Sequence, residues 1–188
     1  EVMERAVAAG QVVARVHSGD PSLYGALREQ LDQLRQRGIE FEVVPGVSSF
    51  LGAAAALAAE YTLPGVSQTV ILTRREGRTP VPPGQGIAEL AQHQASMCIF
   101  LSAGMIDQVL EELRQGYPGD TPAAVVQKAT WPEQLIIRGS LNSIGHQVKA
   151  SGIDKTALIL VGDFLNRGYQ RSCLYSGKFG HGCREPKE

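Results

Sequence analysis

The residues of this chain with the clearest capacity to bind a ligand are Gly19 and Asp20, within the run Ser18-Gly-Asp-Pro21. Apolar β-branched residues at 12–17 predict a buried strand before this run, and leucines at helical spacing over 23–38 predict a helix after it. The turn is therefore expected at the carboxyl end of a strand, where open α/β sheets bind ligands. Gly19 allows close backbone approach, and the Asp20 carboxylate can accept hydrogen bonds from an amine or a hydroxyl.

The same turn has a second interpretation that needs no ligand. Asp and Pro are common at the first positions of helices, where the carboxylate caps backbone N–H groups and proline occupies the first helical position. The residues alone leave both interpretations of Asp20 open.

Two further turns have the same strand-to-helix arrangement. Pro45-Gly-Val-Ser-Ser49 connects a predicted strand at 41–44 to an alanine-rich helix ending near Glu60, with Ser48 or Ser49 as its N-cap. A continuous apolar strand at 97–101 ends in Ser102-Ala-Gly104, whose small side chains would let a ligand lie against the backbone.

A basic, proline-rich loop at 74–84 follows a predicted strand at 68–73. Its arginines, together with Lys128, could bind an anionic group of a ligand through charge-assisted hydrogen bonds. A solvated surface loop is the alternative, and the residues leave it open. The candidate substrate-binding residues in the loop are Arg74, Arg75 and Arg78.

The remaining pattern predicts a second α/β set with three more strands and three helices. The strands are expected at 123–127, 134–138 and 157–161, and the helices at 87–93, 106–114 and 141–150. Because two of these strands follow one another with no helix between them, this sheet is expected to be mixed.

Residues 63–67 interrupt the periodicity and are the candidate linker between domains. The prediction is an N-terminal α/β domain at 1–66, a C-terminal α/β domain with a mixed sheet at 67–165, and a glycine-rich tail at 166–188. The chain opens inside a helical pattern, whereas a parallel α/β unit normally starts with a strand. The N-terminal domain is therefore expected to lack its first strand.

Composition argues against several classes of partner. The 188 residues contain 18 Lys plus Arg and 19 Asp plus Glu, a net charge of -1 that gives no global field for nucleic acid. No apolar run approaches the ~20 residues that span a bilayer, so no membrane partner is expected. The three cysteines have neither metal-ligand nor disulfide-scaffold spacing, which suits a reducing cytoplasm, and Cys98 is predicted to lie in the core.

Motifs for nucleophilic or metal-assisted catalysis are missing from the sequence. The four histidines, His17, His93, His146 and His181, show no metal-ligand spacing, and neither a nucleophile elbow nor a phosphate-binding lysine loop occurs. No metal is therefore predicted, and no catalytic residue can be assigned from the sequence. The pattern favours an enzyme that positions its substrates while a cofactor supplies the reactive group.

Four segments occur in an order and at spacings that resemble the tetrapyrrole (corrin/porphyrin) methyltransferase family. They are Ser18-Gly-Asp-Pro-Ser-Leu-Tyr-Gly25, Val44-Pro-Gly-Val-Ser-Ser49, Ile99-Phe-Leu-Ser-Ala-Gly104 and Ala157-Leu-Ile-Leu-Val-Gly162. Within the family, three segments resemble members that methylate carbon 11 of precorrin-4 or cobalt-precorrin-4: the loop from Leu72 to Pro82, the Phe-Leu-Ser-Ala-Gly run ending at Gly104, and the tail from Leu174 to Arg184.

This resemblance implies two α/β domains with S-adenosylmethionine bound in the cleft between them, in a cytoplasmic homodimer. The family's glycine-rich Gly-Pro-Gly-Asp-Pro loop, which lines the tetrapyrrole trough, is absent from these residues. Ala129 stands where relatives often have glycine. The cofactor contacts that carry over onto matching positions are Ser18, Gly19, Asp20, Leu23, Ser48, Ser49, Leu101, Ser102, Ala103 and Ala129.

The implied reaction is S-adenosylmethionine-dependent C-methylation of precorrin-4 or cobalt-precorrin-4 to precorrin-5 in cobalamin biosynthesis. Such a transfer needs in-line placement and exclusion of water and no strong general base, in agreement with the missing catalytic motifs. One alternative is a family member with another ring position or acceptor, including RNA or protein. A second is an inactive cofactor-binding fragment or a dimerisation scaffold.

Overall fold

The computed structural model describes residues 1–166, 168–172, 176 and 180. Most of the tail motif noted in the sequence, with Cys173, His181 and Cys183, lies outside these described residues. The chain divides into two compact units, Glu1–Leu51 and Gly52–Glu188. This division differs from the boundary expected at residue 66, which stays a prediction.

The first unit is built from helices and extended connections. Helix α1 spans Val2–Ala8, and Gly10, with φ of 75°, follows it in the left-handed conformation expected of a residue just beyond a helix end. Helix α2 spans Leu27–Gln36 and begins four residues later than Leu23, because residues 21–24 form a turn. Helix α3, Ser49–Leu57, starts in this unit directly after Ser48.

The two strands expected in the first unit are not found, and those predictions are wrong. Within residues 1–51, all of which are described, no segment is a strand. Residues 12–17 and 41–44 pair neither with each other nor with another strand, and Val12 and Val44 are exposed. Strand propensity does not suffice here, since a strand is stable only when neighbouring strands satisfy its backbone hydrogen bonds.

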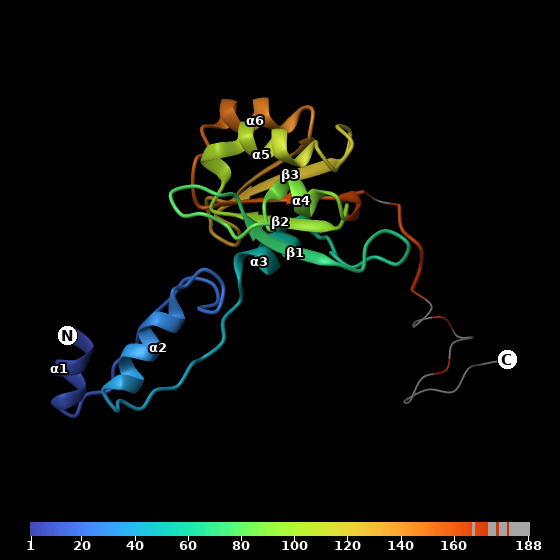
Figure 1. Ribbon diagram of the computed structural model, residues 1–188. Coiled ribbons are helices and arrows are strands. Elements are labelled where there is room, and N and C mark those ends of the chain that lie inside the picture. The colour runs from blue at the N-terminus through green and yellow to red at the C-terminus, as the bar shows by residue number, and fades with distance from the viewer. Residues whose placement is uncertain (167, 173–175, 177–179, 181–188) are drawn as a thin grey trace. The chain divides into compact units, whose positions relative to one another are not determined.

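The second unit contains a five-stranded sheet, in agreement with its sequence pattern (Figure 1). In order across the sheet these are β1 (Val70–Arg74), β2 (Ser96–Phe100), β5 (Ala157–Val161), β3 (Pro122–Gln127) and β4 (Leu135–Ser140).

Strand directions confirm that the sheet is mixed. β1 and β2 are parallel, β5 is antiparallel to both β2 and β3, and β4 is antiparallel to β3. Strands β1, β2 and β3 therefore run in the same direction and end at one edge of the sheet. We call this edge, where the residues following these three strands lie, the carboxyl edge.

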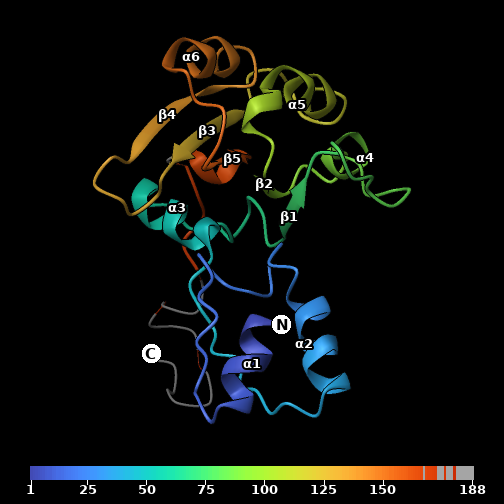
Figure 2. The same ribbon diagram turned by 90° about the vertical axis from the view of Figure 1, so that its left-hand side faces the viewer.

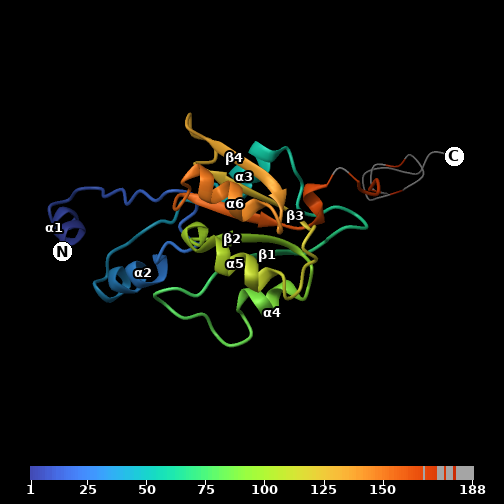
Figure 3. The same ribbon diagram turned by 90° about the horizontal axis from the view of Figure 1, so that it is seen from above.

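Helices cover both faces of the sheet. α4 (Ile87–Ala91), α5 (Ile106–Leu113) and α6 (Ile144–Ser151) lie over one face and α3 lies over the other (Figures 2 and 3). Two 3-10 turns, η1 (Ala103–Met105) and η2 (Asp163–Leu165), follow β2 and β5. None of the helices in the described part of the chain is long and apolar enough to cross a membrane.

Successive side chains of the central strands point to opposite faces of the sheet and so contribute to two hydrophobic layers. Met97 and Ile99 of β2 join the buried cluster under α4, α5 and α6, whereas Cys98 between them contacts Tyr61 on the opposite side. Cys98 is fully buried, which confirms its predicted place in the core. The Tyr61 ring lies 4.9 Å from that of Phe164, and Arg138 of β4 donates to the Leu57 carbonyl at the end of α3.

Candidate functional site

In the first unit, the Asp20 carboxylate joins the two turns that the sequence pattern singles out. Its Oδ1 accepts hydrogen bonds from the Ser22 hydroxyl and from the Ser22 N–H at 2.8 Å. Its Oδ2 accepts from the Gly46 N–H at 2.8 Å. The Ser22 hydroxyl, followed by the two backbone N–H groups, lowers the pKa of Asp20 below its usual value. Asp20 thus holds one turn against the other as a carboxylate.

This geometry excludes the simple helix-capping interpretation of Asp20. Helix α2 begins at Leu27 and its N-cap residue is Ala26, so Asp20 lies well before the helix. The bond from the Ser22 N–H back to Oδ1 is instead that of an Asx-turn.

The two turns approach closely because both contain glycine. A Cβ atom on Gly46 would overlap the Gly19 carbonyl oxygen, and one on Gly19 would lie 3.6 Å from the Ser48 Cα. Gly19 has φ of 70°, a conformation that glycine adopts without strain. The predicted cofactor residues Gly19, Asp20 and Ser48 therefore come together.

The other predicted residues of this unit lie beside those three. Leu23 is half-buried, and its N–H donates to the Asp20 carbonyl at 3.3 Å. Ser18 precedes Gly19 in the same turn, and Ser49 is the first residue of α3.

In the second unit, Ser102 ties together the ends of two parallel strands. This residue is fully buried at the carboxyl edge. Its hydroxyl donates to the Phe100 carbonyl at 2.7 Å and accepts from the Arg75 N–H at 2.9 Å. Ala103 is buried beside it at the start of η1, while Leu101 remains 71% exposed.

Four residues other than glycine have a left-handed backbone at the carboxyl edge. Their φ angles are 54° at Leu101, 47° at Lys128, 71° at Thr130 and 52° at Thr156, which directly precedes the antiparallel β5. Each such conformation is disfavoured for a residue with a Cβ, most strongly for a β-branched one. Strained residues that the surrounding structure holds in place gather at functional sites, which makes this edge a candidate site.

Ala129 lies at the same edge, directly after β3 and Lys128. It packs close to α3, since a Cβ on Gly52 would lie 3.6 Å from the Ala129 Cβ. The sheet thus brings Leu101, Ser102, Ala103 and Ala129 to one edge.

The three predicted substrate arginines have different environments. Arg74 donates to the carbonyls of Thr79 and Pro80, at 3.1 and 2.7 Å, and so closes its own loop. Arg75 forms an ion pair with Glu112 of α5, with 2.7 Å between Nε and Oε1. Arg78 is exposed and forms no ion pair within the part of the chain that the structure describes. Among these three, Arg78 has the guanidinium best placed to meet a ligand.

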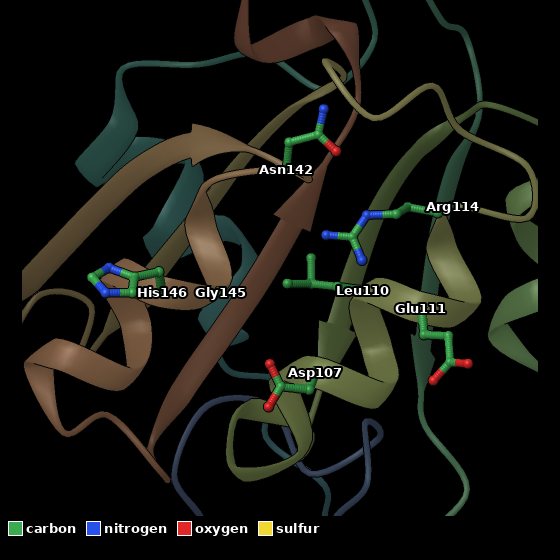
Figure 4. A pocket seen from close by; sticks show the side chains of 7 residues that line it. All are labelled: Asp107, Leu110, Glu111, Arg114, Asn142, Gly145 and His146. Atoms are coloured by element: carbon green, nitrogen blue, oxygen red, sulfur yellow. The ribbon is translucent and has the colours of Figure 1, made fainter.

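Two surface hollows lie in the second unit. One, of about 450 Å³, lies beneath the arginine loop and is lined by residues of that loop, by α4 and by Glu112. The other lies between α5 and α6 (Figure 4). Its lining residues are Asp107, Leu110, Glu111, Arg114, Asn142, Gly145 and His146.

Two charged side chains that line the hollow between α5 and α6 already have partners within the protein. Asp107 forms an ion pair with Lys149 at 3.0 Å, and Arg114 donates to the Leu141 carbonyl. None of the predicted site residues lines it. The carboxyl edge therefore remains the better candidate.

The described residues can bind and orient ligands more readily than they can perform covalent catalysis. No group of three or more His, Cys, Asp or Glu side chains among them could hold a metal ion. Burial raises the pKa of the Cys98 thiol to about 12, so it carries little thiolate at neutral pH.

Sequence reasoning missed three partners that shape these turns. An Asp followed two residues later by Ser is a typical Asx-turn pattern and could have identified Ser22. Gly46 and Glu112 had no such local signal, because each meets its partner across a long stretch of chain.

Comparison with known proteins gives a consistent result. The family model for tetrapyrrole (corrin/porphyrin) methylases matches residues 1–145. A cobalt-precorrin-4 C(11)-methyltransferase of Methanocaldococcus jannaschii is 51% identical over 187 residues, which are 98% of this chain and 72% of that protein. A precorrin-4 C(11)-methyltransferase of Pseudomonas aeruginosa is 46% identical over 182 residues, covering 96% of this chain and 73% of the relative.

A solved structure is similar in fold as well as in sequence. The cobalamin biosynthetic enzyme cobalt precorrin-4 methyltransferase, CbiF, superimposes with a TM-score of 0.85 at 44% identity. The match covers 88% of this chain and 70% of that one. The mixed α/β architecture expected from the sequence is confirmed by this match.

Proposed function

This chain belongs to the tetrapyrrole (corrin/porphyrin) methylase family, and we propose that it methylates carbon 11 of precorrin-4 or cobalt-precorrin-4 in cobalamin biosynthesis. The observation that carries this proposal is the 51% identity over 187 residues to a cobalt-precorrin-4 C(11)-methyltransferase. A relative whose printed name omits cobalt is 46% identical, so both forms of the substrate are included.

The proposed cofactor is S-adenosylmethionine, which supplies a methyl group already activated for transfer. The residues at the carboxyl edge fit such a ligand, because Ser102, Ala103 and Ala129 are small and Leu101 turns the backbone through a left-handed conformation. In the second unit the proposed contacts are Leu101, Ser102, Ala103 and Ala129. In the first unit they are Ser18, Gly19, Asp20, Leu23, Ser48 and Ser49.

The chain's own residues orient the reactants. Ser102 fixes the end of β2 against the end of β1, and Asp20 fixes the Gly46 turn. Holding two reactants in line lowers the barrier without a general base. Arg78, with Arg74 and Arg75 shaping the loop around it, is proposed to bind substrate carboxylates through charge-assisted hydrogen bonds.

The proposal also covers the oligomeric state of the protein and its place in the cell. We propose a homodimer that works in the cytoplasm, on the basis of the family resemblance and of cysteine spacing that does not form a disulfide framework. Sedimentation of the purified chain tests the homodimer directly.

The function is tested by incubating the chain with precorrin-4, or with cobalt-precorrin-4, and S-adenosylmethionine labelled in its methyl group. The expected result is one labelled methyl group on the tetrapyrrole, located at carbon 11 by NMR, with S-adenosylhomocysteine released in equal amount. A methyl group at another ring carbon would identify a different ring specificity. Binding of S-adenosylhomocysteine without transfer would identify a cofactor-binding module and contradict the proposed reaction.

A further inference from the structure

The loop between β3 and β4 presents the only tryptophan of the chain at the carboxyl edge. Trp131 is 55% exposed. The Nζ atom of Lys128 lies over its ring, 6.0 Å from the centroid. An exposed aromatic face and a cation therefore stand together where β3 ends.

Hydrogen bonds hold this loop in one conformation. The Lys128 N–H donates to the Thr156 carbonyl and the Trp131 N–H to the Lys128 carbonyl, both at 2.9 Å. The Thr130 N–H donates to the Gln134 side-chain oxygen at 2.8 Å. These bonds keep Lys128 and Thr130 in the left-handed conformation despite its strain, and so hold the backbone of Trp131 at this edge.

Packing on the inner side of the loop adds to this rigidity. A Cβ on Gly52 of α3 would lie 3.3 Å from the Thr130 Cγ2, a tight contact that shows how closely the loop approaches the helix. The loop thus approaches α3 through Ala129 and Thr130; Ala129 is half-buried there, whereas Thr130 and Trp131 are exposed. A tryptophan side chain has only two torsion angles, so it loses little conformational entropy when it binds a ligand.

The charge of Lys128 is available for a ligand anion. Among the residues the structure describes, the Lys128 ammonium forms a cation–π contact with the Trp131 ring and no ion pair with a carboxylate. A planar, conjugated ring that carries carboxylates would meet both groups at once, since its face can stack on the indole and a carboxylate can pair with the ammonium. S-adenosylmethionine, by contrast, has a single carboxylate, which belongs to its methionine part and is not attached to the planar adenine.

We propose that Lys128 and Trp131 form a binding element for the macrocycle of the polycarboxylated tetrapyrrole substrate, and this inference rests on the function proposed above. Trp131 contacts the face of the macrocycle, and Lys128 pairs with one of its carboxylates. The cofactor does not contact these two side chains.

The test uses the full chain and measures binding by calorimetry with two probes, uroporphyrin III and S-adenosylhomocysteine. The variants are Trp131→Ala, Trp131→Phe and Lys128→Gln. Exposed residues of the same kinds elsewhere in the second unit give matched controls, Tyr169→Ala and Lys149→Gln. Thermal unfolding of each variant establishes that it is folded, and Trp131→Leu replaces Trp131→Ala if the alanine variant is unstable.

Trp131→Ala is expected to weaken uroporphyrin binding by about tenfold, while Trp131→Phe retains most of the affinity because it keeps an aromatic face. Lys128→Gln is expected to weaken it and to flatten its dependence on salt. Affinity for S-adenosylhomocysteine stays unchanged in all variants, as does uroporphyrin affinity in the two controls. Unchanged uroporphyrin affinity in Trp131→Ala, or equal losses for both probes, would overturn the inference.

Methyl transfer by the unaltered chain separates this inference from the proposed function. If that chain transfers no methyl group to precorrin-4 but binds uroporphyrin through Trp131, the reaction is wrong and the binding element stands. If it transfers the methyl group and the Trp131 variants have the same KM for precorrin-4, the binding element is wrong and the reaction stands.

Discussion

The carboxylate of Asp20 accepts a hydrogen bond at 2.8 Å from the backbone N–H of Gly46, which follows it by 26 residues. The other oxygen of the same carboxylate holds the Ser22 turn. One side chain thus fixes the two turns whose sequences pointed most clearly to a ligand. We therefore expect Asp20 to contribute to ligand binding at these turns at least partly by positioning the backbone of the turns.

Replacing Asp20 by Ala should loosen the Gly46 turn and weaken cofactor binding. The Gly46 and Ser22 amides lose their acceptor, so their hydrogen exchange should accelerate, and S-adenosylhomocysteine affinity should fall by about tenfold. NMR-detected exchange and calorimetry measure the two effects. Glu29→Ala, an exposed carboxylate on α2, is the matched control and should change neither. Unaltered exchange at Gly46 in Asp20→Ala would show that this contact does not hold the turn.

The contact between the turns should also depend on pH in a defined direction. Hydrogen bonds from Ser22 and Gly46 lower the pKa of Asp20 below 3.8, its value in an unfolded chain. A lowered pKa means that the stabilising contribution is fully present above pH 3.8 and is lost as pH falls through the folded-state pKa. The Gly46 amide shift followed by NMR should therefore titrate with a midpoint below 3.8. A midpoint above that value would contradict the hydrogen-bonded geometry.

Gly46→Ala should separate the two turns by steric overlap alone. The added Cβ would overlap the Gly19 carbonyl oxygen, a backbone atom that no rotamer change can move away. S-adenosylhomocysteine affinity should fall by at least about tenfold, measured by calorimetry. Gly38→Ala is the control, because Gly38 has open space around it; its φ of 64°, which Gly46 does not share, strains the alanine there without bringing it into contact with either turn. Equal losses in both variants would indicate general loosening of the first unit.

Two arginines of the loop, Arg75 and Arg78, should respond differently to substitution. Arg78→Gln should raise the KM for the tetrapyrrole and reduce its salt dependence, with the cofactor dissociation constant unchanged. Arg75→Gln removes a half-buried ion pair with Glu112 and should cost about 1 kcal/mol of unfolding free energy. Kinetics at several salt concentrations and chemical denaturation distinguish the two roles. A KM for Arg78→Gln equal to that of the parent chain would show that the loop is solvated surface.

The sequence predicted the second unit much better than the first. In the second unit, apolar runs such as 97–101 and 157–161 became central strands because each had neighbours on both sides. Residues 12–17 are also rich in β-branched apolar residues but have no partner strand, and Val12 and Val16 are exposed. The local sequence pattern shows that a segment can form a strand, but whether it does so depends on the strands that lie beside it in the fold.

In the candidate site, too, local features were predicted from the sequence and long-range contacts were not. Ser102 and Ala103 were predicted from their position after a strand, and the sheet places them at the carboxyl edge as expected. Two contacts could not be predicted: the hydrogen bond from the Arg75 N–H to Ser102, and the ion pair between Arg75 and Glu112. Both join segments that are far apart in the sequence and are brought together only when the sheet forms. The exposure of Trp131 likewise depends on the conformation of the loop between β3 and β4, which the local sequence pattern did not predict.

Cys98 provides a test of the hydrophobic layer beneath α3. Burial raises the pKa of its thiol from 9.0 to about 12, and burial also raises the pKa values of Tyr61 and Tyr117. Each group must stay neutral in the folded chain, so its contribution to stability is complete below its unfolded-state pKa and is lost as pH rises toward the folded-state value. The free energy of unfolding should therefore fall between pH 9 and 12.

Denaturation of the parent chain and of Cys98→Ala at several pH values in this window isolates the thiol. The Ala variant should be less stable at neutral pH, because it loses the buried sulfur, but its stability should fall less steeply above pH 9. The tyrosines account for the decline that remains in both proteins. Val126→Ala, which removes apolar volume from β3 without removing a titrating group, is the matched control and should keep the slope of the parent chain. Identical slopes for the parent and Cys98→Ala would mean that the thiol ionises in the folded chain as readily as in water, and that the layer around it admits solvent.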